Sequence, residues 1–115
     1  MKPVSGIAIY PDKRVEEVEI SGLEEFQAIV DGLIEPVDLK FGTMYVNEEF
    51  RYKFGPDDFN SIAADVAGLG GRADLLLFGV LGPVVLVGGV DDEGYDLPVT
   101  EAGRAAVARV AREAS

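Results

Sequence analysis

The alternation of hydrophobic and polar residues predicts a β-hairpin at the start of the chain. Val4–Tyr10 is rich in apolar residues, and in Val15–Ile20 two valines and an isoleucine lie among glutamates. Pro11-Asp12-Lys13 lies between the two runs. Proline presets the backbone angle of a turn and aspartate caps it, so we expect the two runs to pair as antiparallel strands.

A short helix is predicted between Ser21 and Gly32. Ser21 and Glu24 have the spacing of a capping box, in which serine and glutamate satisfy free amides at a helix start. Apolar residues then recur at helical spacing, at Leu23, Phe26, Ile29 and Val30. Gly32 is expected to end the helix, because glycine adopts the left-handed conformation at low cost.

Three strand-like segments follow this helix. Leu33–Leu39 contains Pro36, which cannot donate a backbone hydrogen bond and therefore predicts a sheet edge or a bulge. Met44–Val46 resumes strand character. Phe50–Phe54 alternates aromatic and cationic residues, which predicts a strand with one buried face. The polar segment Asn47–Glu49 is then expected to be the tip of a hairpin.

A second helix is predicted from Gly55 to Gly68. Pro56 suits its first turn, and its apolar stripe would consist of Phe59, Ile62, Ala63 and Val66. The apolar run Leu75–Leu81 that follows does not show which element it forms.

The last third of the chain predicts one strand and one helix. Pro83–Val87 is a continuous β-branched and aliphatic run with apolar flanks, as in a central strand covered on both faces. Thr100 is placed to cap a closing helix, whose inner face would be Ala106, Val107, Val110 and Ala111.

Together these elements predict an α+β fold. We expect a mainly antiparallel sheet of about five strands and two or three helices, packed on one face in a two-layer arrangement. The 115 residues are 48% hydrophobic, enough to bury one core, and no linker divides them. A single domain over residues 1–115 is therefore expected.

The composition limits the kinds of catalytic and metal sites that the chain can form. The chain has no Cys and no His, which removes thiolate nucleophiles, thiolate zinc sites and the commonest general base. Asp91, Asp92, Glu93 and Asp96 lack the alternating spacing of a calcium loop and are interpreted as a solvated turn. We expect a protein that is not an enzyme and that has no cofactor and no metal.

The net charge of −11 arises from 21 acidic and 10 basic residues spread along the chain. Such a charge repels nucleic acids and anionic membranes, so neither is an expected partner. Three explanations stay open: solubility, adaptation to a salty cytoplasm, and an acidic surface that imitates DNA. No apolar run is long enough to span a membrane and no signal peptide is visible, so a cytoplasmic location is expected.

Six residues are candidates for interaction: Asn47, Glu48, Glu49, Arg51, Lys53 and Asn60. The two asparagines carry donors and acceptors that suit either a buried bond to backbone or recognition of a ligand edge. The two cations alternate with aromatic residues, an arrangement that seats a base and a phosphate, although pairing with acidic residues on a neighbouring strand explains it as well.

Five pieces of the chain, which together cover roughly residues 5 to 90, carry a resemblance: the opening strand, Leu23–Ile34, Tyr45–Glu49, Asn60 with Ala63, and Gly82–Gly88. They resemble a small family of unknown function carried by bacteriophages, mobile elements and actinobacterial hosts. The resemblance implies an accessory protein of phage type and brings no catalytic residues with it.

Two functions are therefore expected from sequence. The first is a non-enzymatic phage or mobile-element accessory protein that binds a host protein through its acidic surface, with DNA mimicry as one form. The alternative is a domain that binds a small nucleotide-like ligand near Asn47, Arg51 and Asn60. The oligomeric state stays open, since an edge strand near Pro36 would serve a homodimer or be blunted.

Overall fold

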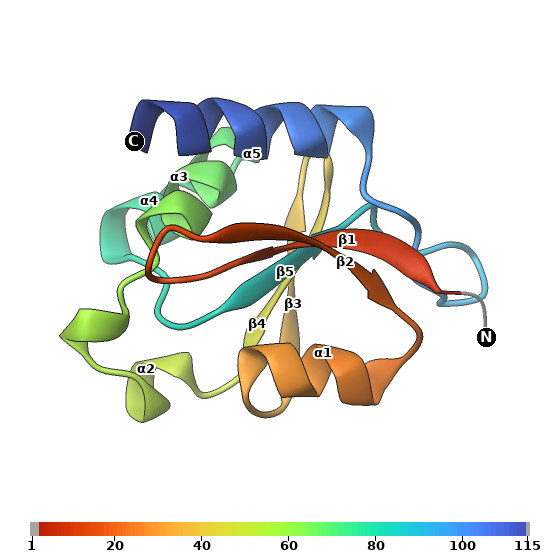
Figure 1. Cartoon of the computed structure of the whole chain (residues 1–115), viewed down its shortest axis with the longest axis horizontal. Coiled ribbons are helices and arrows are strands. Elements are labelled where there is room, and N and C mark those ends of the chain that lie inside the picture. Colours follow the sequence, from red (N-terminus) through yellow and green to blue (C-terminus); the bar gives the residue numbers. More distant parts are fainter. Residues whose placement is uncertain (1–2, 115) are drawn as a thin grey trace.

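The computed structural model describes residues 3–114 and has a five-stranded antiparallel sheet at its centre (Figure 1). The spatial order of the strands is β2-β1-β5-β4-β3. Their bounds are Val4–Ile9 for β1, Val15–Ile20 for β2, Ile34–Leu39 for β3, Gly42–Asn47 for β4 and Val84–Val87 for β5. The predicted opening hairpin is confirmed, because Val4 pairs with Ile20 and Ile9 with Val15.

The central strand β5 requires cover on both faces of the sheet. Its four side chains are all buried, and successive side chains of a strand point to opposite faces. Val84 and Leu86 therefore belong to one hydrophobic core, while Val85 and Val87 belong to a second. The prediction of a doubly covered central strand is confirmed.

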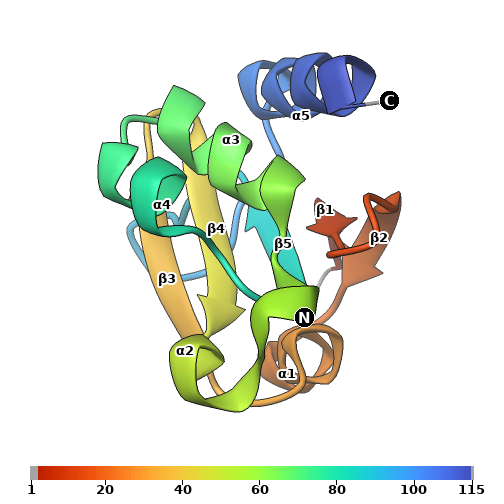
Figure 2. The ribbon, with the colours of Figure 1, turned by 90° about the vertical axis from the view of Figure 1, so that its left-hand side faces the viewer.

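Helices cover both faces, as Figures 1 and 2 show from two directions. Helix α1, Leu23–Val30, packs on the core that contains Val85 and Val87. Helices α3, Ser61–Leu69, α4, Ala73–Phe78, and α5, Glu101–Ala114, lie on the opposite core. The α+β class and the antiparallel sheet are confirmed. The expected two-layer arrangement with helices on one face is not found, because α1 covers the face of the sheet opposite α3, α4 and α5.

Five α-helices are present among residues 3–114, more than the two or three expected. The difference comes from the short helices α2 and α4, which lie in segments whose apolar pattern does not indicate a helix. The single turn α2, Phe50–Lys53, and the 3-10 turn Pro56–Asp58 connect β4 to α3. The run Leu75–Leu81 lies largely in α4. No helix in the described part of the chain is both long and apolar enough to cross a membrane.

The predicted strand Phe50–Phe54 is wrong, since most of this segment forms α2. The Oδ1 atom of Asn47 accepts a hydrogen bond from the Glu49 amide at 2.8 Å, and the Glu49 carbonyl then accepts from the Tyr52 and Lys53 amides. These bonds coil the chain directly after β4. Phe50 is buried whereas Tyr52 is 92% exposed, so the aromatic residues do not share one face.

The ends of α1 also differ from the prediction. Glu25, and not Glu24, accepts a hydrogen bond from the Ser21 amide, at 2.9 Å. Asp31 takes the left-handed conformation expected of Gly32, with φ 63°. Glycine is still required at position 32, because its φ is 154° and an added Cβ would lie 2.7 Å from Nδ2 of Asn47.

Pro36 lies on the edge strand β3, so its missing amide costs no hydrogen bond within the sheet, and the predicted edge is confirmed. At the other end of the chain, Thr100 caps α5 as expected. Its Oγ1 accepts from the Gly103 amide at 3.0 Å and donates to the Phe41 carbonyl at 3.0 Å.

Asn60 divides the predicted second helix into two parts. Its Oδ1 accepts from the Ala63 amide at 3.1 Å, so α3 begins at Ser61 and Phe59 stays outside it. Its Nδ2 donates to the Ile9 and Gly82 carbonyls, each at 2.9 Å. A single side chain that is fully buried thus joins α3 to β1 and to the segment before β5.

Replacement of Asn60 by alanine is expected to destabilise the fold by about 2–4 kcal/mol, because it leaves one amide and two carbonyls buried without these partners. Urea denaturation measures the change. Ser61→Ala, one residue further along and within the helix, is the control and should cost well under half as much. Equal losses for the two variants would contradict the connecting role of Asn60.

Candidate functional site

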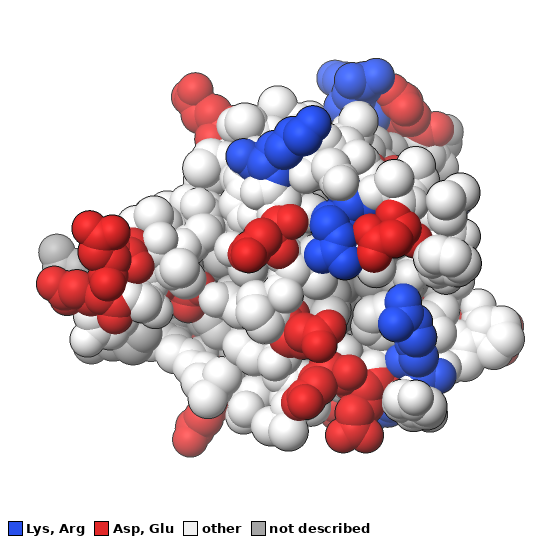
Figure 3. Space-filling view, turned by 180° about the vertical axis from the view of Figure 1, so that it is seen from behind, with Lys and Arg blue, Asp and Glu red and all other residues white. Residues whose placement is uncertain are grey.

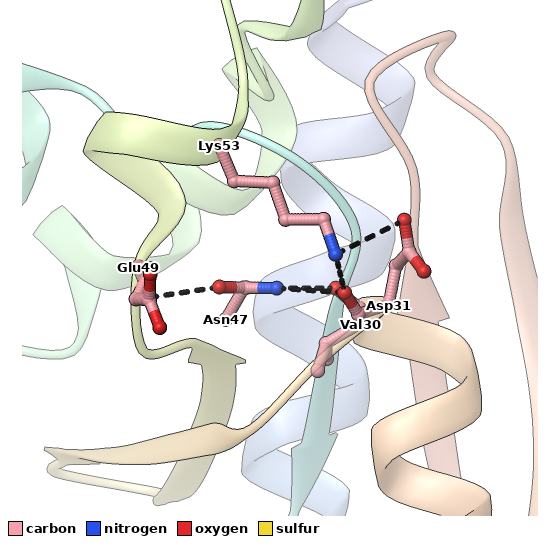
Figure 4. Close-up of polar contacts among 5 residues, drawn as sticks. All are labelled: Val30, Asp31, Asn47, Glu49 and Lys53. Atoms are coloured by element: carbon pink, nitrogen blue, oxygen red, sulfur yellow. Dashed lines mark hydrogen bonds and ion pairs between the residues drawn. The ribbon is translucent and has the colours of Figure 1, made fainter.

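Three of the six residues predicted for interaction meet at the C-terminal end of α1 (Figure 4). Asn47 Nδ2 donates to the Val30 carbonyl at 3.0 Å and to the Asp31 carbonyl at 3.1 Å, while its Oδ1 holds the Glu49 amide. Lys53 Nζ donates to the Asp31 carbonyl and lies 3.4 Å from Asp31 Oδ2. Together they satisfy carbonyls that a helix end leaves free and place a cation at the negative end of its dipole.

The other three candidates lie elsewhere. Glu48 and Arg51 are exposed, and the Arg51 guanidinium lies 5.0 Å from the ring centre of Phe50. Asn60 is buried beside β1 and α3, as described above. The side chains of Asn47 and Asn60 are thus engaged within the fold, and neither they nor Arg51 line the cavity on the α1 face or the one beside Thr100.

A cavity of about 710 Å³ opens on the α1 face of the sheet. Phe26 of α1 and Tyr45 of β4 line it with their rings 4.7 Å apart between centroids and inclined at 57°. The other apolar walls come from β1, β2, α1 and β3, through Val4, Ile20, Leu23 and Ile34. The sheet and the helix therefore provide a hollow lined mainly by hydrocarbon and aromatic groups.

The remaining wall is a short hairpin that extends β5. The Gly88 amide donates to the Leu97 carbonyl and the Leu97 amide to the Gly89 carbonyl, each at 2.8 Å. At its tip, Oδ1 of Asp91 accepts from the Glu93 and Tyr95 amides, each at 2.9 Å. These bonds order the hairpin and hold Asp91, Tyr95 and Asp96 against the cavity.

Tyr45 and Asp96 form the polar feature of this cavity. The Tyr45 hydroxyl donates to Asp96 Oδ1 at 2.6 Å, and the tyrosine residue is 8% exposed. Burial raises the pKa of the Tyr45 phenol well above its ordinary value, and the hydrogen bond to Asp96 and the negative charges of Asp96 and Asp38 raise it further. Tyr45 is therefore held as a neutral donor to Asp96.

This arrangement is suited to binding. A phenol with a raised pKa is a poor nucleophile and a poor general base, but it is a persistent hydrogen-bond donor. The walls would remove an apolar group from water, and the carboxylates at one end would orient it. Among residues 3–114, no group of three or more acidic side chains is close enough to hold a metal ion.

Sequence reasoning missed Tyr45 and Asp96 as a pair. The useful signal was a tyrosine in an otherwise apolar strand, because a buried phenolic hydroxyl usually needs a partner. Which residue would supply that partner was not visible, since Asp96 lies 51 positions further along the chain. The sequence around Asp96 instead indicates a solvated turn.

The Tyr45 phenol is expected to ionise clearly above the ordinary value of 10.0. The difference between alkaline absorbance titrations of the native protein and Tyr45→Phe isolates this group. Because the unfolded chain loses the proton near pH 10 while the folded one keeps it, stability should fall as pH rises above about 10. Tyr45→Phe should remove that part of the fall, and a phenol that titrates at its ordinary value would contradict the described contact.

Comparison with curated proteins gives no match, and neither does comparison with solved structures. Residues 1–110 match the family described as a domain of unknown function (DUF3846). The sequence resembles a family of unknown function, and the match confirms this part of the resemblance. Since it extends over nearly all of the chain, including every strand, α1 and most of α5, the protein belongs to this family.

Proposed function

We propose that this protein acts by non-covalent binding and that its binding site is the cavity between α1 and the Gly88–Leu97 hairpin. The observation that carries the proposal is the cavity itself, with its volume of about 710 Å³ and its aromatic floor of Phe26 and Tyr45. Sites for small molecules typically have 300–1,000 Å³, mostly apolar walls and a few placed polar groups.

In this proposal the protein is a non-enzymatic accessory protein of a bacteriophage or mobile element and works in the cytoplasm of a bacterial host. The support for that origin is the resemblance of the opening strand, Leu23–Ile34 and Gly82–Gly88 to phage-borne sequences. The proposal moves the ligand away from Asn47, Arg51 and Asn60, since the amides of both asparagines already bond to backbone.

A second candidate function is binding of a host protein through the acidic surface. Five ion pairs involve Glu16, Glu17, Asp31, Asp74 and Glu113, so most of the 21 carboxylates lack a cationic partner in the described part of the chain. Figure 3 shows acidic side chains in separate groups on one face, with Lys and Arg between some of them. That pattern favours a partner with a basic surface over mimicry of two phosphate rows.

A glycine at the cavity wall allows a test of the first function. Gly22 lines the cavity, its backbone is extended, and an added Cβ would meet nothing within 4 Å. Gly22→Leu should therefore preserve the fold and obstruct the cavity. Small organic fragments that bind the native protein in ligand-observed NMR should bind this variant at least about tenfold more weakly. The leucine would occupy space in which a fragment buries apolar surface, and burial of a leucine-sized group contributes about 1.5–3 kcal/mol of free energy.

Gly55→Leu is the matched control. Gly55 also precedes a helical turn, has a negative φ of −104° and leaves open space for a Cβ, but it does not line the cavity. Fragments should bind this variant as they bind the native protein. If fragments bind Gly22→Leu undiminished, or if none binds the native protein, the cavity is not the binding site.

The second function predicts a partner whose capture depends on salt. A host protein retained by the immobilised chain at about 0.05 M salt should be released by about 0.5 M, because screening shortens the reach of exposed charges to a few ångströms. Retention that does not change with salt would show that carboxylates do not hold the partner. Capture before and after saturation with a cavity-binding fragment separates the two candidate functions.

A further inference from the structure

We infer that the cavity selects a small molecule with an apolar or aromatic body and one cationic amino group. This inference rests on the proposed function and gives the chemical class of the ligand. It is carried by the polar end of the cavity, where Tyr45, Asp91 and Asp96 lie together.

The side chains at that end offer hydrogen-bond acceptors. The Tyr45 proton is used on Asp96 Oδ1, so its hydroxyl oxygen presents only lone pairs to a ligand. The second carboxylate oxygen of Asp96 is available to a ligand. Oδ2 of Asp91 is available as well, because both backbone amides that this side chain accepts are bound at Oδ1. An ammonium group has three donors and no acceptor, and it therefore complements this set.

The charge of the site points to the same chemistry. No Lys or Arg lines the cavity among the described residues, and neither Asp91 nor Asp96 forms an ion pair within residues 3–114. The whole chain carries −11. Within residues 3–114, a phosphate or carboxylate ligand would meet two carboxylates and no cation, whereas an amine would gain charge-assisted hydrogen bonds.

The apolar walls determine the size and the apolar character of the rest of the ligand. Leu23 is 57% exposed and Tyr95 is 52% exposed, so these two lining residues offer apolar and aromatic surface to a ligand, whereas Phe26 and Tyr45 are almost fully buried. A cavity of about 710 Å³ is far larger than an ammonium ion, so the cation must carry a body that fills the walls. An exposed aromatic ring also attracts a nearby cation, which favours an amine close to Tyr95.

Three probes of similar size test the inference: phenethylamine, phenethyl alcohol and phenylacetate. Titration of the full chain, followed by backbone amide shifts, should show the amine binding about tenfold or more tightly than the alcohol, as expected for a hydrogen bond to a charged group. Phenylacetate should bind more weakly than the alcohol, because the carboxylates repel it.

Asp96→Asn keeps the shape of the side chain and removes its charge, so the preference for amine over alcohol should fall several-fold. Asp65→Asn makes the same change in charge at an exposed position of α3 and should keep the preference. If Asp96→Asn folds poorly, the comparison of the three probes on the unmodified protein still shows whether the cavity prefers an amine.

The outcomes separate this inference from the function on which it rests. Equal binding of amine and alcohol within the cavity would overturn the amine preference and leave the binding function standing, and so would a preference for phenylacetate. If no probe and no fragment shifts any amide of the cavity walls, the binding function and the amine preference both fail.

Discussion

Burial of all four side chains of β5 is the constraint on which the rest of the structure depends. Val84 and Leu86 need one apolar cover and Val85 and Val87 need another, because the sheet presents them on opposite faces. Helices α3, α4 and α5 provide the first cover, and α1 provides the second. The chain therefore has a helical layer on each side of an antiparallel sheet.

The cavity follows from the way the second face is covered. Helix α1 has eight residues and so is only about 12 Å long, too short to close the whole face of a five-stranded sheet. Asn47 and Lys53 fix its C-terminal end, while the Gly88–Leu97 hairpin stands beyond its first turn. The space between helix and hairpin is the cavity, so the residues that hold α1 in place determine the shape of the site without entering it.

Much of the fold was predictable because it depends on local patterns. Three local features each indicate one element: the turn residues Pro11-Asp12-Lys13 between two apolar-containing runs, the proline at position 36, and the uninterrupted apolar run of β5. Prediction failed at Phe50–Phe54, where a side-chain bond from Asn47 coils a segment whose composition suits a strand. The site was missed for a related reason, since Tyr45 and Asp96 meet only through the tertiary fold and neither stands out in its own segment.

The most direct measurement is the set of nuclear Overhauser contacts made by bound phenethylamine. Binding in the cavity predicts contacts from its ring protons to the rings of Phe26 and Tyr45, and from the methylene next to its amine to the side chain of Tyr95. Leu77 and Phe78 of α4, each 79% exposed, are the contrasting apolar surface on the other side of the sheet. Contacts confined to those two residues would contradict the account.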